Sequence, residues 1–229
     1  MSDGAPSGLP AGLGITRIGP RTFAWGTRTF VMGILNVTPD SFSGDGLLAG
    51  VASGDPVGRA VSLATAMADA GADLLDVGGE SSRPGHAAID ADEEIARVVP
   101  IIRAIGAALP LMPISVDTTK PAVAAAALGA GAHLVNDVWG VAEDDALARL
   151  AAKRRVPIVL MHNRGEARYT TLLPEIVADL QRAIERALRA GVPWENVIID
   201  PGFGFGKTAE HNLALLRDLG SLAILGRPI

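Results

Sequence analysis

Two hydrophobic patterns alternate along the chain. Short aliphatic runs such as FVMGIL at 30–35 and PIVLM at 157–161 are typical of strands buried on both faces of a parallel sheet. Longer Ala-rich segments between them, such as 57–70, repeat apolar residues at helical spacing. The predicted strands are 30–35, 73–77, 111–116, 133–135, 157–161 and 196–199, with another beginning at 228–229, and the predicted helices are 57–70, 93–109, 121–129, 142–154, 174–190 and 210–219.

This alternation is typical of either a (β/α)8 barrel or an open doubly wound sheet. Three junctions, AGADLLD, GAGAHLVND and RAGVPWENVIID, each lead from a helix through Gly into a strand that ends in an acidic or amide residue. This quasi-repeat favours the barrel. A closed barrel needs eight strands and about 250 residues. We therefore expect an incomplete α/β fold of the (β/α)8 TIM-barrel type, with about six to seven of the eight strands, as in a fragment or the product of a truncated gene.

The domain organisation follows from composition. Residues 1–20 are rich in Gly, Pro and Ser and are expected to form a flexible N-terminal arm. Residues 21–229 are expected to form one domain that lacks the C-terminal strands and helices of the barrel. An incomplete barrel would expose an unpaired strand edge and part of its core, so we expect poor solubility or dimerisation.

Composition excludes several classes of function. The chain has no Cys, which rules out disulfides, a thiolate nucleophile and a Cys-ligated metal. Its net charge of -5 argues against non-specific binding of nucleic acid. No targeting signal and no apolar stretch of membrane-spanning length stands out. These features favour a cytoplasmic protein whose partners are small molecules, with no nucleic acid and no membrane.

Polar residues stand where the predicted strands end. In parallel α/β folds the carboxyl ends of the strands carry the functional site, so we expect these side chains to share one site. A few could instead cap helices or bond to loops. The strand-end residues are Asn36, Asp76, Asp117, Asn136 with Asp137, His162 and Asp200.

The loops after three of these strands also carry candidate chemistry. The first is NVTPDSFSGDG at 36–46, and the second is GGESSRPG at 78–85, whose Arg83 suits an anion or a stacked ring. The third, DPGFGFGK at 200–207, allows a flat ligand to approach the backbone. It does not match a phosphate-binding P-loop, because position 201 is Pro where the motif requires Gly.

The chemistry of the strand ends suggests a class of ligand. Asp117, Asn136 and Asp200 combine carboxylate acceptors with an amide that both donates and accepts. Together they could recognise the edge of an amino-substituted heterocycle. From the residues alone, a pterin, guanine and other purines all remain open.

Six motifs make the sequence resemble the dihydropteroate synthases. They are MGILNVTPDSFSGDG at 32–46, DLLDVGGESSRPG at 73–85, ISVDTTKP at 114–121, LVND at 134–137, LMH at 160–162 and IIDPGFGFGK at 198–207. The resemblance covers residues from about 30 to 229. It implies a (β/α)8 barrel of folate biosynthesis that condenses 6-hydroxymethyl-7,8-dihydropterin pyrophosphate with p-aminobenzoate and releases pyrophosphate. It also implies a requirement for Mg²⁺, a homodimer and a sulfonamide target.

The resemblance also implies a role for individual residues. The expected catalytic residues are Asp117, Asp200, Asp40 and Arg83. The expected pterin-binding residues are Asp76, Asp117, Asn136, Met161, Asp200 and Phe205. Those expected for p-aminobenzoate are Ser82, Arg83 and Pro84, and Asn36 is the expected contact of the metal or pyrophosphate.

The implied mechanism begins with departure of pyrophosphate, which leaves a cationic methylene-pterin. Asp117 and Asp200 would disperse that positive charge before the aniline nitrogen of p-aminobenzoate attacks. The family's Ser-Arg-Lys and Arg-x-His motifs cannot be assigned in this sequence, and neither Lys207 nor Arg227 is expected to replace them. The loop HNRGEARYT at 162–170 departs from the family's commoner wording.

Two alternative functions stay open at the level of sequence. One is a methyltetrahydrofolate-dependent methyltransferase, which the TPDSFS and SSRPG loops argue against. The other is a non-catalytic or fragmentary pterin-binding remnant.

Overall fold

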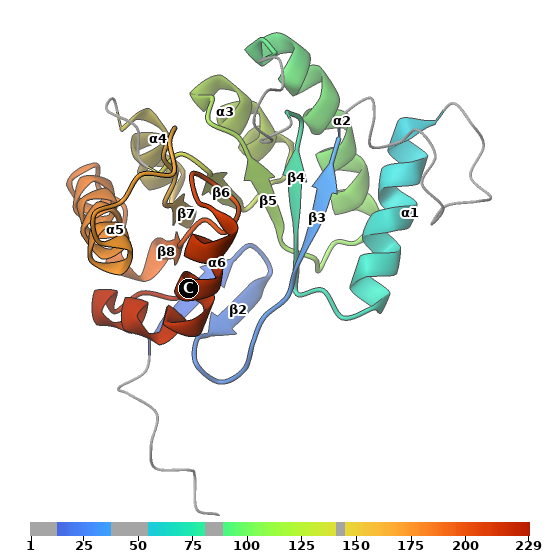
Figure 1. The fold of residues 1–229 in the computed structure, drawn as a ribbon. Helices are drawn as coiled ribbons and strands as arrows, with labels where there is room; N and C mark the ends of the chain where they lie inside the picture. The colour runs from blue at the N-terminus through green and yellow to red at the C-terminus, as the bar shows by residue number, and fades with distance from the viewer. Residues whose placement is uncertain (1–12, 38–54, 81–88, 141–144) are drawn as a thin grey trace, which may run out of the picture.

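A single parallel sheet organises the molecule (Figure 1). The computed structural model describes residues 13–37, 55–80, 89–140 and 145–229. In these ranges β3 and β8 are each paired with one neighbouring strand only, so the sheet is not closed into a barrel. Its strands pair in chain order as β3 (Met32–Asn36), β4 (Leu74–Gly78), β5 (Ile114–Asp117), β6 (Leu134–Asp137), β7 (Ile158–Met161) and β8 (Val197–Asp200).

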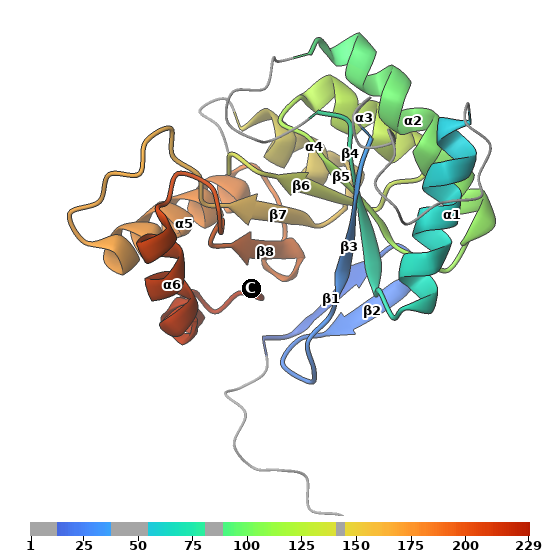
Figure 2. The same cartoon turned by 45° about the vertical axis from the view of Figure 1, so that its right-hand side comes forward.

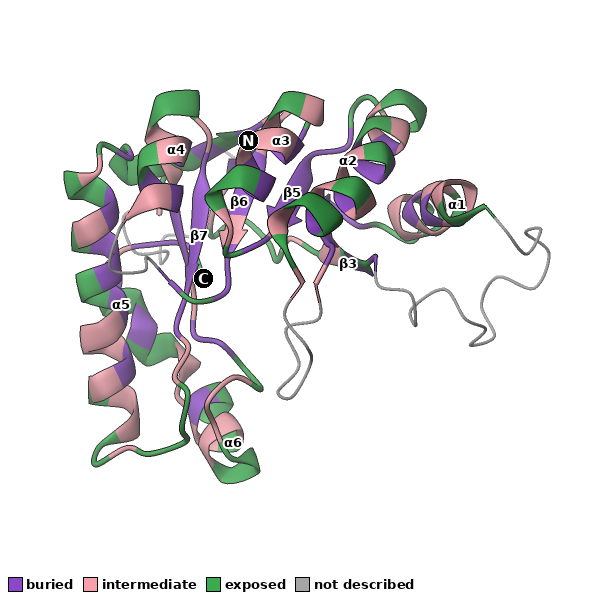
Figure 3. Cartoon of the chain, turned by 90° about the horizontal axis from the view of Figure 1, so that it is seen from above, coloured by how far each residue is buried: buried purple, intermediate pink, exposed green. Residues whose placement is uncertain are grey.

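Helices follow the strands and cover the outer face of the sheet. Seen from above, the buried residues of the helices lie on the sides that face the strands (Figure 3). Local signals set where the helices begin: the Asp90 carboxylate accepts a hydrogen bond of 2.7 Å from the Glu93 N–H, and Pro121 opens the third helix. The helices are α1 (Pro56–Asp69), α2 (Ala91–Ala108), α3 (Pro121–Ala130), α4 (Ala146–Arg154), α5 (Leu172–Arg189) and α6 (Ala209–Arg217).

Alternate residues along each strand face opposite sides, and the two sides differ in chemistry. One set, such as Leu75 and Val77 of β4, packs against the helices in the main core. The other set faces the inner side of the sheet. Near the start of the strands this inner set is apolar and includes Leu74, Leu134, Val159 and Ile198. Two residues further along it becomes Asp76, Asn136, Met161 and Asp200, so the inner side is apolar at one end and polar at the other.

A short antiparallel hairpin packs against the apolar end. It consists of β1 (Ile15–Ile18) and β2 (Arg21–Ala24), and it lies at the foot of the strands (Figure 2). Ile18 and Phe23 are fully buried against the inner apolar residues. The prediction of a flexible arm through residue 20 was therefore wrong for residues 15–18, since burial of apolar side chains holds them in a strand. Residues 1–12 lie outside the described ranges.

Most predicted elements are confirmed, although several of their bounds differ from the prediction. The strand predicted at 111–116 begins only at Ile114, because Met112 N–H bonds to the Leu109 carbonyl in a turn. The helix predicted at 210–219 ends at Arg217. A 3₁₀ helix, Leu219–Leu225, follows it and was not anticipated.

The strand predicted to begin at 228–229 is not formed. The Ile199 N–H nevertheless donates a 2.9 Å hydrogen bond to the Pro228 carbonyl, so the chain returns alongside β8 at this point. Arg227 lies in the same segment and is buried, with its Nε bonded to the Val197 carbonyl at 3.0 Å. Val197 begins β8, so Arg227 supports the end of the sheet opposite the polar strand ends.

None of the described helices is both long enough and apolar enough to cross a bilayer.

Candidate active site

The register of the sheet brings the predicted polar residues to one level. Asn36 pairs with Gly78, Gly78 with Asp117, and Asp117 with Asn136. A Cβ atom placed on Gly78 would lie 3.3 Å from Asp117 Oδ2 and 3.6 Å from Asn36 Oδ1. Because Gly78 has no side chain, the Asn36 amide and the Asp117 carboxyl flank the same open space.

Asp76 lies one layer deeper on the inner side. Its Oδ2 accepts a hydrogen bond of 2.9 Å from Asn136 Nδ2, while its Oδ1 is buried and accepts no hydrogen bond of normal geometry from a described residue. Burial raises the pKa of Asp76, the side chains of Ser115 and Asn136 oppose the rise, and the negative charge of Asp200 adds to it. A buried carboxyl oxygen without a partner is costly, so the site is prepared for a ligand that donates a hydrogen bond there.

Asp117 ends β5 in a strongly negative environment. Burial raises its pKa to about 8, and the surrounding carboxylates, Asp76 first and Glu94 second, contribute to the shift. In this environment the neutral acid form of Asp117 is favoured at neutral pH. A cationic or proton-donating ligand would favour its ionised form.

Asp200 ends β8 next to the glycine-rich loop. Its Oδ1 accepts a hydrogen bond of 2.7 Å from the Gly202 N–H, which fixes the orientation of the carboxyl group. Burial raises the pKa of Asp200, whereas the Gly202 bond and the positive charge of Lys207 oppose the rise. Met161, also predicted to line the pocket, is buried and is the register partner of Asp200 on β7.

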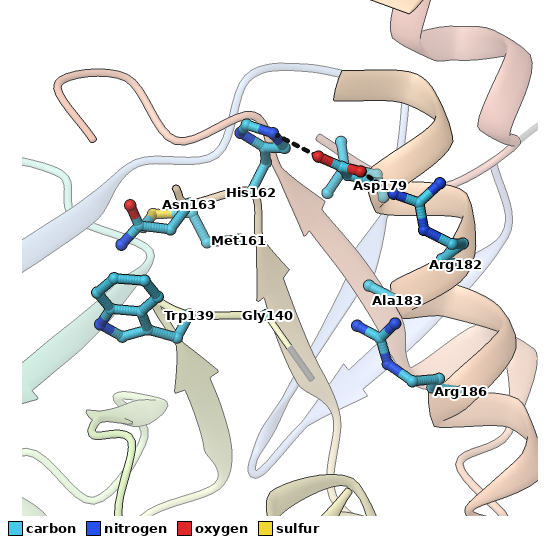
Figure 4. Close-up of a pocket in the computed structure, with 10 residues that line it drawn as sticks. Trp139, Gly140, Met161, His162, Asn163, Asp179, Arg182, Ala183 and Arg186 are labelled. Atoms are coloured by element: carbon cyan, nitrogen blue, oxygen red, sulfur yellow. Dashed lines mark hydrogen bonds and ion pairs between the residues drawn. The ribbon is translucent and has the colours of Figure 1, made fainter. Parts of the chain in front are cut away.

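Two strand-end residues do not share this site, contrary to prediction. Asp137 Oδ1 accepts a bond of 3.1 Å from the Trp139 N–H, and His162 Nε2 lies 3.1 Å from Asp179 Oδ2 of α5 (Figure 4). Asp137 follows Asn136 and His162 follows Met161, and consecutive strand residues face opposite sides of the sheet. Both side chains therefore point toward the helix layer.

A pocket of about 150 Å³ lies in that helix-side region (Figure 4). Trp139 and Gly140 form one side, and Arg182 and Arg186 of α5 form the other. Asp179 is already ion-paired with Arg164 at 2.8 Å and with Arg182. Arg186 Nε lies 3.8 Å from Asp145 Oδ1, so both arginines of this wall have acidic partners.

Two lysines, Lys207 and Lys120, lie at this end of the sheet, and neither was assigned a functional role from the sequence. Lys207 Nζ lies 3.0 Å from His162 Nδ1 and donates to the carbonyls of Gly202, at 2.8 Å, and Phe205, at 3.0 Å. Burial lowers the pKa of Lys207 to about 8. These contacts agree with the expectation that Lys207 does not replace a missing substrate ligand.

Lys120 joins three elements in a second cluster. Its Nζ pairs with Glu94 of α2 at 2.6 Å and with Glu80 after β4, and Glu94 is buried. The other oxygen of Glu80 accepts from the Ile89 N–H at 3.2 Å. Only the Lys-Pro pair at the start of a helix hinted at this cluster in the sequence, because its acidic partners come from distant segments.

The remaining predicted site residues are Phe205, which lies in a described loop, and four residues outside the described ranges. Phe205 is half-buried in the loop after β8, with its N–H bonded to the Gly202 carbonyl at 3.2 Å. The residues that lie outside the described ranges are Asp40, Ser82, Arg83 and Pro84.

The described side chains contain no group of three or more His, Asp or Glu residues arranged to hold the predicted Mg²⁺. Asn36 Oδ1 is nevertheless an exposed oxygen ligand beside Asp117. Mg²⁺ is commonly held by one or two protein oxygens together with substrate phosphates, and this pair of side chains fits that mode.

Comparisons with known proteins bear directly on this arrangement. Residues 32–229 match the model of the pterin binding enzyme family. The chain is 48% identical over 213 residues to the dihydropteroate synthase of Clostridium beijerinckii, covering 93% of this chain and 77% of the relative. The Bacillus subtilis dihydropteroate synthase is 46% identical, with 92% and 71% covered. The chain belongs to the dihydropteroate synthase family.

Solved structures of dihydropteroate synthases share the fold. The Clostridium difficile enzyme in the presence of pteroic acid superposes with a TM-score of 0.83 at 43% identity, covering 90% of this chain and 76% of the other. The Xanthomonas albilineans enzyme in complex with 7,8-dihydropteroate superposes with a TM-score of 0.77 at 42% identity, covering 88% and 71%. The six strands and their helices thus correspond to part of the TIM barrel of this family.

Proposed function

We propose that this chain condenses 6-hydroxymethyl-7,8-dihydropterin pyrophosphate with p-aminobenzoate, and that its inner polar layer binds the pterin ring. We assign the pterin site to this layer because three carboxyl groups and one amide converge there. They belong to Asp76, Asp117, Asn136 and Asp200. A pterin presents ring N–H and amino groups along one edge. The unpartnered Asp76 Oδ1 would accept from that edge.

The electrostatics of this layer favour a cation over a neutral ring. Burial raises the pKa of each of the three carboxyl groups, so ionising each one costs free energy. Positive charge that develops on the pterin as pyrophosphate leaves would stabilise the ionised carboxylates. An interaction that strengthens as the transition state forms raises the rate of the chemical step.

The remaining groups are assigned by position and resemblance. Asn36 would contact Mg²⁺, which would neutralise charge on the departing pyrophosphate. Asp40 belongs to the first loop, and Ser82, Arg83 and Pro84 to the proposed p-aminobenzoate site. Phe205 would lie against the pterin from the loop after β8. A cytoplasmic location, a homodimer and sulfonamide binding stay predictions from the resemblance.

The test is the release of pyrophosphate from the dihydropterin substrate, measured with this chain, Mg²⁺ and increasing p-aminobenzoate. Asp200→Asn should lower kcat by about 100-fold or more, because it removes a charge aimed at the developing cation. Far-UV circular dichroism and thermal melting should remain close to those of the unmodified chain.

Asp137→Asn is the matched control. It makes the same chemical change at the end of another strand of the sheet, β6, but the side chain faces the helices and Asn keeps an acceptor for the Trp139 N–H. We expect its kcat to stay within about threefold of the unmodified chain. Equal losses in both variants would contradict the proposed role of the inner layer. Pterin binding without any release of pyrophosphate would favour the non-catalytic remnant.

A further inference from the structure

The loop after β8 lies directly on the segment that follows β7. Gly202 has φ +72°, and a Cβ atom there would come within 2.0 Å of the His162 carbonyl oxygen. Gly206 has φ +54°, and its Cβ atom would come within 2.3 Å of the Arg164 carbonyl oxygen. Only glycine permits both this backbone conformation and this close approach. The two segments are therefore packed backbone to backbone.

Hydrogen bonds of Lys207 connect the loop after β8 to the segment that follows β7. Its ammonium group donates to two carbonyls of its own loop, Gly202 and Phe205, and lies 3.0 Å from the Nδ1 of His162 on the neighbouring segment. All three Lys207 donors are thus used within the protein. The same loop carries the two groups assigned to the pterin site, Phe205 and the Gly202 N–H that orients Asp200.

His162 is held in a single protonation state for this role. Burial lowers its pKa to about 4, so the ring is neutral at physiological pH. Lysine can only donate, so Nδ1 is the acceptor and the ring proton lies on Nε2, facing Asp179 Oδ2 at 3.1 Å. Asp179 in turn is fixed by Arg164 at 2.8 Å. A continuous chain of hydrogen bonds therefore links α5 to the loop after β8.

We propose that Lys207 is a positioning residue for the pterin half of the reaction, acting through the Gly202 and Phe205 carbonyls and His162 rather than by touching substrate. This inference rests on the proposed function. Without the Lys207 ammonium group, the loop loses its central donor, and Phe205 and the Asp200 carboxyl lose their fixed geometry. Recognition of the pterin ring weakens, whereas recognition of p-aminobenzoate does not change.

Two pterin probes separate positioning from direct contact with phosphate. Titration calorimetry of Lys207→Met with 6-hydroxymethyl-7,8-dihydropterin, which has no pyrophosphate, should show binding about tenfold weaker than in the unmodified chain. The same loss is expected for the pyrophosphate substrate with Mg²⁺. A loss confined to the pyrophosphate form would overturn the proposal, since it would make Lys207 a phosphate ligand. Unchanged binding of both probes would overturn it as well.

A matched pair at His162 tests the hydrogen-bond chain. Asn and Leu have nearly the same shape, but only Asn keeps an acceptor close to the position of Nδ1. We expect His162→Asn to bind the pterin within about threefold of the unmodified chain, and His162→Leu to be weakened about as much as Lys207→Met. Equal affinities in the two His162 variants would contradict a role for the Lys207 contact.

Amide hydrogen exchange tests the role of Lys207 in the loop independently of whether the chain binds pterin. Peptides that span 201–206 should exchange at least about tenfold faster in Lys207→Met, whether or not a ligand binds. Peptides from β5 and β6 serve as internal controls and should not change. If the unmodified chain fails to bind pterin, the proposed function fails even where the exchange result holds. If it binds but exchange at 201–206 is unaltered, only the role of Lys207 is refuted.

Discussion

Two aspartates at the carboxyl end of the sheet, Asp117 and Asp200, each have a lysine in the following loop, but the two lysines act differently. Lys120 is ion-paired with Glu80 and Glu94, and these two glutamates still raise the pKa of Asp117. Lys207 bonds to carbonyl groups and a neutral histidine, and its charge opposes the rise that burial causes in the pKa of Asp200. The charge of Lys120 is balanced by its two glutamates, whereas the charge of Lys207 acts on the aspartate beside it.

The pKa values of the two lysines show the same contrast. Hydrogen bonds and charge from the two glutamates raise the pKa of Lys120 despite its partial burial. Burial lowers the pKa of Lys207 to about 8, because carbonyl dipoles replace water less well than carboxylates do. Lys120 thus behaves as part of a structural ion cluster, and Lys207 as a group that can lose its proton near physiological pH.

The largest expected effect comes from breaking the Lys120 cluster. Lys120→Met leaves the carboxylate of Glu94, which is 1% exposed, buried without its partner. We expect the free energy of unfolding to fall by about 3 kcal/mol, measured by urea denaturation. Adding Glu94→Gln should recover much of the loss, because it removes the buried charge. A loss in the double variant as large as in the single one would show that charge burial is not the cause.

A smaller and pH-dependent effect is expected at Asp117. Its pKa rises from 3.8 in the unfolded chain to about 8 in the folded one, so the folded state binds more protons between these values. Stability from this group is therefore complete below about pH 4 and declines as pH rises through 8. Asp117→Asn removes the decline and should stabilise the chain by about 2 kcal/mol at pH 8, but by little at pH 4. A gain that is independent of pH would refute this explanation.

The smallest expected effect is the pH dependence of pterin affinity caused by Lys207. Its pKa is lowered to about 8, with Asp200, Arg164 and neutral His162 as its charged or titratable neighbours. The three hydrogen bonds require the protonated amine, so affinity is complete below pH 8 and falls above it. We expect binding of 6-hydroxymethyl-7,8-dihydropterin to weaken about fivefold between pH 7 and pH 9.

The control for this measurement is Lys207→Met, because Asp117 titrates in the same range and is retained in that variant. The difference between the two pH profiles isolates Lys207. If Lys207→Met showed the same decline as the unmodified chain, the loss would belong to Asp117.

Much of the fold, and the four polar residues on the inner side of the sheet, could be predicted from local sequence patterns. Continuous apolar runs and Ala-rich segments located the six strands of the parallel sheet and the six α-helices of the described residues, because each pattern reflects how many faces of an element are buried. They did not locate the hairpin of β1 and β2. Asp76, Asp117, Asn136 and Asp200 could be assigned to one site since strand ends of a parallel sheet meet at one edge. The error for Asp137 and His162 arose because a one-residue step along a strand reverses the direction of the side chain.

The sequence by itself determined the family, the order of strands and helices, and the identity of the acids at the carboxyl end of the sheet. These properties are encoded within segments of about ten residues. Only the tertiary structure decided which acids face the inner side of the sheet, which lysine is paired with Glu80 and Glu94, and which lysine bonds to the carbonyls of a loop. Those outcomes depend on groups that are 26 to 45 residues apart in the chain, such as Lys120 with Glu94 and Lys207 with His162, and no local pattern records such distances.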